Sequence, residues 1–368
     1  MPKRIERVIE LFRKTPRDRQ GERGREAAHA GAARQQEEDQ MVPFAIAGVQ
    51  MPVPAMHDNI AAMIHRIDVV AARFPWVQMI VFSELAMCGP VHNNPVPLPG
   101  PQEAALQAAA RKHGVWLITG GVFERLPDGR IVNTCSVIGP DGEVVTRYRK
   151  MFPFRPYERD VAAGTEFCVF DVPGVGRFGL SICYDIWFPE TTRTLTAMGA
   201  EVLLHPVLTG TIDRDVELAM ARATAAQFQC YVFDINGLGA GGVGRSCVVD
   251  PAGTVLHQAA GGEEVIPVEI DLMQVRRQRE TGLRGLGQVL KSFRDRDVDF
   301  SVYDRNSGID SYLHALGPLA MPQKGSQAGL GGSLHQSTAA EPAGGSHPAE
   351  LHADAGIQEA MHGHGNHS

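Results

Sequence analysis

The fold is decided by residues 176–190, which read GRFGLSICYDIWFPE. An apolar run from Phe178 to Ile182 has the composition of a buried strand, and Pro189-Glu190 has the chemistry of a helix start. Cys183 therefore falls at a strand-to-helix corner, where a rigid scaffold can expose a side chain and a helix N-terminus favours the thiolate. One cysteine at one corner fits a structural thiol as well as it fits a nucleophile.

Two other predicted strands end in charged side chains. The apolar run 77–82, VQMIVF, leads into Glu84, and the run 144–148, VVTRY, leads into Lys150. A carboxylate, an ammonium and a thiol that each follow a strand can converge at one edge of a sheet, which is where α/β proteins place their chemistry. Glu84 is then a candidate general base, and Lys150 a candidate partner for an oxyanion.

The trio Glu84, Lys150 and Cys183, with the sequence around each residue, resembles the nitrilase superfamily of carbon–nitrogen hydrolases from about residue 43 to residue 300. The lysine loop, RKMFPFRPYE at residues 149–158, is similar to that of the aliphatic amidase and formamidase branch. The similarity includes a second glutamate, Glu158, eight residues after the lysine. True nitrilases typically carry a glutamate two residues after the nucleophile, so Asp185 favours amides over nitriles as substrates.

The resemblance implies an α/β fold, a four-layer α-β-β-α sandwich, and a homodimer or higher homo-oligomer that pairs through a helical layer. It also implies a thiol-dependent amidohydrolase that cleaves a linear, non-peptide amide to a carboxylate and ammonia. Cys183 would form a thioester, Glu84 would act as the base, and Lys150 would stabilise the oxyanion. Glu158 would position the substrate, or orient Lys150 and the attacking water. No metal and no organic cofactor is implied.

Three residues are candidates for substrate binding within this resemblance. The backbone N–H of Tyr184 would help Lys150 to hold the oxyanion, and Thr209 lies in a loop that the family places beside the nucleophile. Arg155 stands where the branch commonly has a small residue, and Phe154 where it commonly has a tryptophan. A guanidinium at this position would favour an acidic substrate.

Two alternatives use the same residues differently. The first is an N-carbamoyl amine or amino-acid amidohydrolase, which would require Arg155 and Arg222 to face Cys183 if the substrate carries a carboxylate. The second is a non-catalytic or ammonia-delivering subunit, which the appended terminal segments suggest. Against the second stands the intact trio, because a binding module has no need of all three residues.

Composition narrows the class of protein. The net charge of −7 and the pI of about 6.1 argue against a nucleic-acid binder, whose binding domain is usually basic. No apolar run is long enough to span a membrane and no signal-peptide pattern is present, so we expect a cytoplasmic protein. The six cysteines form no CxxC pair and no zinc-ligand spacing.

The domain organisation is read from changes in composition. Residues 1–42 are expected to be an extension with a short amphipathic helix, residues 43–317 the hydrolase domain, and residues 318–368 a disordered, low-complexity, histidine-containing tail.

Individual elements are predicted from their caps and periodicity. Asp58 is the expected N-cap of a helix that ends before Pro75. A second helix follows Asp213, with an apolar face made of Val216, Met220, Ala223 and Phe228. Turns at Pro-Asp-Gly sequences within a β/α-alternating chain predict a mixed sheet. His205, which precedes a proline at a strand end, is expected to be structural.

Overall fold

The computed structural model describes residues 41–324, apart from residues 241, 305, 310 and 323. The expected N-terminal helix and the histidines of the tail lie outside these residues. The chain divides into two compact units, residues 1–299 and residues 300–368. The described part of the second unit contains the short helices η3 (Ser301–Tyr303) and α9 (Ser311–Ala315). The first unit contains the predicted trio.

The first sheet of this unit is mixed, as predicted. It holds, in order, β15 (Glu264–Asp271), β1 (Pro43–Gln50), β3 (Met79–Phe82), β4 (Trp116–Ile118), β6 (Ile131–Ile138) and β5 (Val122–Arg125), and β7 (Val144–Arg149) pairs with β6. The strands β1, β3 and β4 are parallel, with Ile46 beside Met79 and Met79 beside Trp116. All four residues of β3 are buried, which accounts for its uninterrupted apolar sequence.

The second sheet holds, in order, β14 (Val255–Gln258), β13 (Cys247–Val249), β11 (Tyr231–Asn236), β10 (Val202–Val207), β9 (Gly176–Leu180) and β8 (Cys168–Val172). Its central strands β9, β10 and β11 are parallel. The two-residue strands β2 (Pro52–Val53) and β12 (Leu238–Gly239) form a separate parallel pair.

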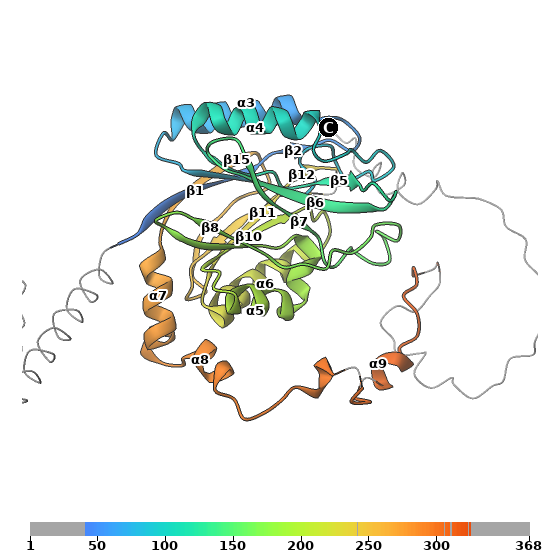
Figure 1. The fold of residues 1–368 in the computed structure, drawn as a ribbon, viewed down its shortest axis with the longest axis vertical. Coiled ribbons are helices and arrows are strands. Elements are labelled where there is room, and N and C mark those ends of the chain that lie inside the picture. Colours follow the sequence, from blue (N-terminus) through green and yellow to red (C-terminus); the bar gives the residue numbers. More distant parts are fainter. Residues whose placement is uncertain (1–40, 241, 305, 310, 323, 325–368) are drawn as a thin grey trace, which may run out of the picture. The chain divides into compact units, whose positions relative to one another are not determined.

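Helices cover the outer face of each sheet. The first unit contains α3 (Ile60–Arg73), α4 (Pro101–His113), α5 (Pro189–Ala197), α6 (Asp213–Phe228), α7 (Leu272–Thr281), α8 (Val289–Arg294), η1 (Cys183–Trp187) and η2 (Leu283–Gly285). Proline opens α4, and Gly114 ends it in the left-handed conformation, at φ 64°. Figure 1 shows α3 and α4 on one side of the stacked sheets and α5 and α6 on the other.

Three buried clusters correspond to the three interfaces between these layers. One lies between the sheets and joins residues such as Ile46 and Val81 of the first sheet to Leu180 and Leu204 of the second. The second packs the first sheet against α3 and α4, and the third packs the second sheet against α5 and α6. The architecture is the predicted four-layer α-β-β-α sandwich.

Two details of the helices differ from the sequence-based predictions. The N-cap of α3 is Asn59, not Asp58, although the Asp58 carboxylate still accepts the Ile60 N–H at 2.9 Å. The predicted apolar face of α6 is right for the buried Phe228 and for Met220, which packs partly buried against the core, and wrong for Val216 and Ala223. Val216 is exposed and the buried residues include the charged Arg214 and Glu217. A buried polar network that includes Arg214 and Glu217 occupies the inner side of this helix, which disguises its periodicity.

Candidate active site

The carboxyl ends of the two sheets meet at the site. Glu84 follows β3 of the first sheet, and its backbone N–H donates to the carbonyl of Val207, the last residue of β10 in the second sheet, at 3.1 Å. Gly120 packs against the same turn, where a Cβ at its position would lie 1.8 Å from the Ser83 carbonyl oxygen. Its φ of 77° also belongs to the region that favours glycine. The turn that carries Glu84 is therefore tightly fixed.

Lys150 connects the two predicted glutamates. It follows β7, and its Nζ lies 2.8 Å from Glu84 Oε1 and 3.2 Å from Glu158 Oε2. Only 2% of Lys150 and 3% of Glu84 is exposed to solvent, so these charges interact with little screening by water. The Phe154 N–H donates to Glu158 at 2.5 Å, which ties the second glutamate to its own loop.

Cys183 is the first residue of the short η1 helix that follows β9, and it is half-buried. Its φ is 46°, in the left-handed region that non-glycine residues rarely adopt. The turn is held by the buried Asp185, which accepts hydrogen bonds from Tyr148 Oη at 2.7 Å, Ile182 N at 2.8 Å and Phe152 N at 2.9 Å. Asp185 therefore fastens the nucleophile turn to the lysine loop.

The electrostatics of the trio indicate a protonated resting thiol. Burial and the Glu84 carboxylate raise the pKa of Cys183 well above its ordinary value, and Lys150 opposes them only in part. Burial and the Glu84 charge thus act against the thiolate that a helix N-terminus was expected to favour. Burial also raises the pKa of Glu84, while Lys150 lowers it by less. A carboxylate whose proton affinity is raised is well suited to take the proton of the thiol.

Lys150 remains a cation in this environment. Burial lowers the pKa of its ammonium, but Glu84 and Glu158 together raise that pKa well above its ordinary value. The ammonium is thus available as a charged hydrogen-bond donor beside the sulfur. The structure brings together all four predicted catalytic residues, from three different loops.

The predicted substrate-binding residues have different surroundings. The Thr209 hydroxyl lies 3.9 Å from the Cys183 sulfur. The Tyr184 ring packs edge-on against Phe154 and Phe188. Arg155 donates to the carbonyls of Arg159 and of Val161, the latter at 2.8 Å, and Arg222 donates to the Gly253 carbonyl at 3.3 Å. Both guanidiniums are thus engaged with backbone, and these contacts give no support to a carboxylate held by them beside Cys183.

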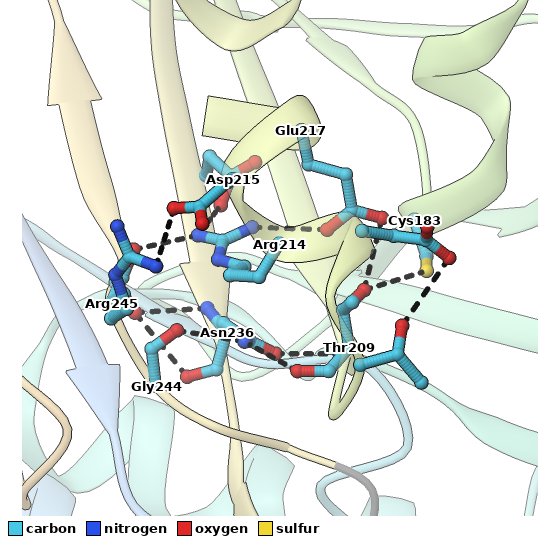
Figure 2. Close-up of polar contacts among 12 residues, drawn as sticks. Cys183, Thr209, Arg214, Asp215, Glu217, Asn236, Gly244 and Arg245 are labelled. Atoms are coloured by element: carbon cyan, nitrogen blue, oxygen red, sulfur yellow. Dashed lines mark hydrogen bonds and ion pairs between the residues drawn. The ribbon is translucent and has the colours of Figure 1, made fainter. Parts of the chain in front are cut away.

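Sequence reasoning missed two contributors to the site. Asn133, in β6, donates its side-chain N–H to Glu84 Oε1 at 2.8 Å. Glu217, in α6, accepts the Thr209 hydroxyl at 3.0 Å (Figure 2). Two signals could have found them, since buried polar groups require partners. Asn133 is a polar residue within an apolar strand, and Glu217 is an acid on the inner face of a helix.

His205 lies beneath the site as a buried structural residue. Its Nδ1 is 2.7 Å from Ser181 Oγ, two residues before the nucleophile. Burial lowers the pKa of His205 from 6.5 to about 4, although Asp234 opposes the shift. The fold therefore holds the imidazole neutral.

Acid is expected to destabilise the protein through this histidine. Because its pKa is lower in the folded state, its contribution to stability is complete above pH 6.5 and is lost as pH falls from 6.5 to 4. The loss is about 3 kcal/mol of unfolding free energy. Urea unfolding at pH 7 and at pH 4.5 should show a smaller difference for His205→Asn than for wild type. His257→Asn, which changes a half-buried histidine paired with Glu264, should keep the wild-type difference.

Comparisons with known proteins agree with this geometry. Residues 32–280 match the family described as carbon–nitrogen hydrolase. The 2-oxoglutaramate amidase of Bacillus subtilis is 33% identical over 182 residues, which are 48% of this chain and 70% of that protein. The omega-amidase NIT2-A of Xenopus laevis is 32% identical over 207 residues, which are 50% of this chain and 71% of that protein.

Solved structures support the same fold. Saccharomyces cerevisiae Nit3, described as a member of branch 10 of the nitrilase superfamily, superposes with a TM-score of 0.60 at 24% identity, over 65% of this chain and 93% of that one. A carbon–nitrogen hydrolase from Helicobacter pylori G27 superposes with a TM-score of 0.60 at 23% identity, over 72% of this chain and 99% of that one. This chain belongs to the carbon–nitrogen hydrolase family of the nitrilase superfamily.

Proposed function

We propose that this protein is a thiol amidohydrolase that cleaves a linear, non-peptide amide through a thioester on Cys183. The observation that carries the proposal is the position of Lys150, buried 2.8 Å from Glu84 and 3.2 Å from Glu158, beside a cysteine held at φ 46°. A structural ion pair would not require a strained cysteine next to it.

In the proposed reaction, Glu84 takes the thiol proton as the Cys183 sulfur attacks the amide carbon. Lys150 and the backbone N–H of Tyr184 stabilise the oxyanion, and the expected contribution is about 3–4 kcal/mol per well-placed donor. The carbon–nitrogen bond then breaks, and Glu84 gives its proton to the leaving nitrogen to release ammonia. Glu84 next takes a proton from water, which cleaves the thioester to a carboxylate and restores the thiol.

The substrates of the relatives suggest where to look for the acyl group. Two relatives are named for 2-oxoglutaramate and for omega-amides. We propose ω-amides of dicarboxylic acids as the first substrate class to test. N-carbamoyl compounds remain the alternative, because the same four residues would serve both reactions.

The proposal is tested by the release of ammonia from short aliphatic amides, ω-amides of dicarboxylates and N-carbamoyl compounds. Release from either amide class, with an equal amount of carboxylate, is the expected result. Release from carbamoyl compounds alone, with carbon dioxide, would replace the amidase by the carbamoyl reaction. No release from any class, together with a Cys183 that iodoacetamide does not alkylate, would favour the non-catalytic subunit.

The assembly and the compartment are proposed on separate grounds. We expect a homodimer or a higher homo-oligomer, as the family resemblance implies, and light scattering of the full chain would measure it. All six cysteines lie in the described residues and are free thiols. Free thiols are typical of a reducing compartment, which supports the cytoplasm. Within the described ranges, no helix is long and apolar enough to cross a membrane.

A further inference from the structure

A polar chain connects the nucleophile to a buried acid on the helix behind it. The Cys183 sulfur lies 3.9 Å from the Thr209 hydroxyl, and that hydroxyl donates to Glu217 Oε1 at 3.0 Å. Figure 2 shows the three side chains in sequence, from the η1 turn through the Thr209 loop to α6. The reaction proposed above makes no use of Glu217.

Hydrogen bonds fix the Thr209 backbone and the Glu217 carboxylate of this polar chain. Asn236 fixes the Thr209 backbone from both sides, because its Oδ1 accepts the Thr209 N–H at 2.9 Å and its Nδ2 donates to the Thr209 carbonyl at 3.0 Å. Arg214 fixes Glu217, with its Nη1 3.3 Å from Glu217 Oε2, and is itself held by Asp234 at 2.5 Å and by the Arg245 carbonyl at 2.8 Å. The hydroxyl proton of Thr209 is the part that can reorient.

The direction of that proton depends on the protonation of Glu217. An ionised carboxylate can only accept a hydrogen bond, so it takes the Thr209 proton and leaves the sulfur without this donor. A protonated carboxyl can donate to the Thr209 oxygen, which frees the Thr209 proton to point at the sulfur. A donated hydrogen bond favours the charged form of the group that accepts it, here the thiolate.

We propose that Glu217 is a positioning residue that sets the direction of the Thr209 hydroxyl and thereby the reactivity of the Cys183 sulfur. The inference rests on the proposed role of Cys183 as the nucleophile. Glu217 itself touches neither the sulfur nor, in the proposed reaction, the substrate.

The groups around Glu217 bring its pKa close to neutral pH. Burial and Asp234 of β11 raise the pKa of Glu217 to about 7, while Thr209 and Arg214 oppose the shift. The Cys183 thiol, across the Thr209 loop, is the other titratable group that faces it. The protonated form of Glu217 is therefore present below neutral pH and disappears above it.

Glu217→Gln separates the two states. The carbonyl oxygen of the introduced amide would take the place of Oε2 opposite Arg214, which can only donate, so the amide N–H would face Thr209. The substitution thus imitates the protonated acid. It also removes a negative charge, which by itself favours the thiolate, so the effect is measured again in a Thr209→Val background that lacks the hydroxyl.

The experiment measures the rate of alkylation of Cys183 by iodoacetamide in the full chain from pH 6 to 9, by mass spectrometry of the peptide that contains Cys183. Glu217→Gln is expected to raise the rate about threefold to tenfold at pH 8, the effect of about one hydrogen bond to a charged group. In the Thr209→Val background the same substitution is expected to give less than half of that increase. The neighbouring Asp215→Asn, at an exposed acid paired with Arg245, should keep the wild-type profile.

An equal increase in both backgrounds would overturn the proposal, because it would show a charge effect alone. No increase would overturn it as well. Thr209→Val compared with Thr209→Ser gives a second test that leaves the Arg214 pair intact. The rate ratio of the serine to the valine variant should be largest at pH 6 and approach one at pH 9, and a constant ratio would contradict the inference. A Cys183 that does not react at any pH would instead refute the proposed nucleophile, and the inference with it.

Discussion

Replacing Cys183 with alanine is expected to reduce amide hydrolysis by a factor on the order of 10⁴ or more, while the protein stays folded. No other described residue at the site can form the thioester, because the groups beside the sulfur are carboxylates, an ammonium and a hydroxyl. Folding should tolerate the smaller side chain, since Cys183 is only half-buried and alanine leaves no large cavity. Steady-state release of ammonia from the best substrate, with circular dichroism to verify folding, measures the effect.

Cys88→Ala is the matched control. Cys88 is also a half-buried free thiol, but burial raises its pKa to about 11 and it has no lysine or glutamate of the site beside it. Its replacement should leave the kcat/KM for amide hydrolysis within about twofold of wild type, because substitutions away from the site and its supporting contacts usually have small effects. Activity of Cys183→Ala within tenfold of wild type would refute the thiol mechanism.

Lys150→Met is expected to damage both activity and stability. It removes a charged donor from the oxyanion, for which a loss of about 10²–10³ in kcat is typical. It also leaves the buried Glu84 and the half-buried Glu158 without their cation, and breaking a buried pair such as Glu84–Lys150 costs about 3–5 kcal/mol of unfolding free energy. The loss of stability should be smaller at pH 5 than at pH 8, because burial raises the pKa of Glu84 and a protonated Glu84 no longer needs the cation.

The control for this variant is Lys112→Met, which removes an exposed lysine from its pair with Asp68. A surface pair of this kind is screened by water and salt and contributes little, so urea unfolding should hardly change and turnover should stay at the wild-type rate. If Lys150→Met unfolds at the wild-type urea concentration at pH 8, the buried network is not the charged system described above.

The convergence of Glu84, Lys150 and Cys183 was predictable because each of these residues follows an apolar run. Such runs are the sequence pattern of buried parallel strands, whose carboxyl ends lie together. The sheets and the position of Cys183 followed from the same local patterns. The place of Glu158 beside the Lys150 ammonium came from the resemblance of the lysine loop, because spacing alone does not reveal which way a loop folds.

The polar network next to Cys183 could not be predicted from the periodicity of the sequence. An acid and an arginine on the inner side of α6, Glu217 and Arg214, look like solvated charges in the sequence. Only the tertiary structure shows that Arg214 pairs with Asp234 and that Glu217 accepts a hydrogen bond from Thr209. Along the chain, Asp234 and Thr209 are 17 and eight residues away from Glu217. Buried polar pairs between distant segments leave no local signature, and this is also why the apolar face of α6 was misassigned.

The most direct test of the central claim is to trap the acyl-enzyme. The protein is mixed with its best amide substrate, quenched in acid within milliseconds to seconds, and analysed by mass spectrometry of the intact chain and of the peptide that contains Cys183. We predict a mass increase equal to the acyl group less one hydrogen, located on Cys183 and removed by hydroxylamine as the hydroxamate. An acyl group on a different residue, or turnover with no adduct and no hydroxamate at any time, would contradict the proposed mechanism.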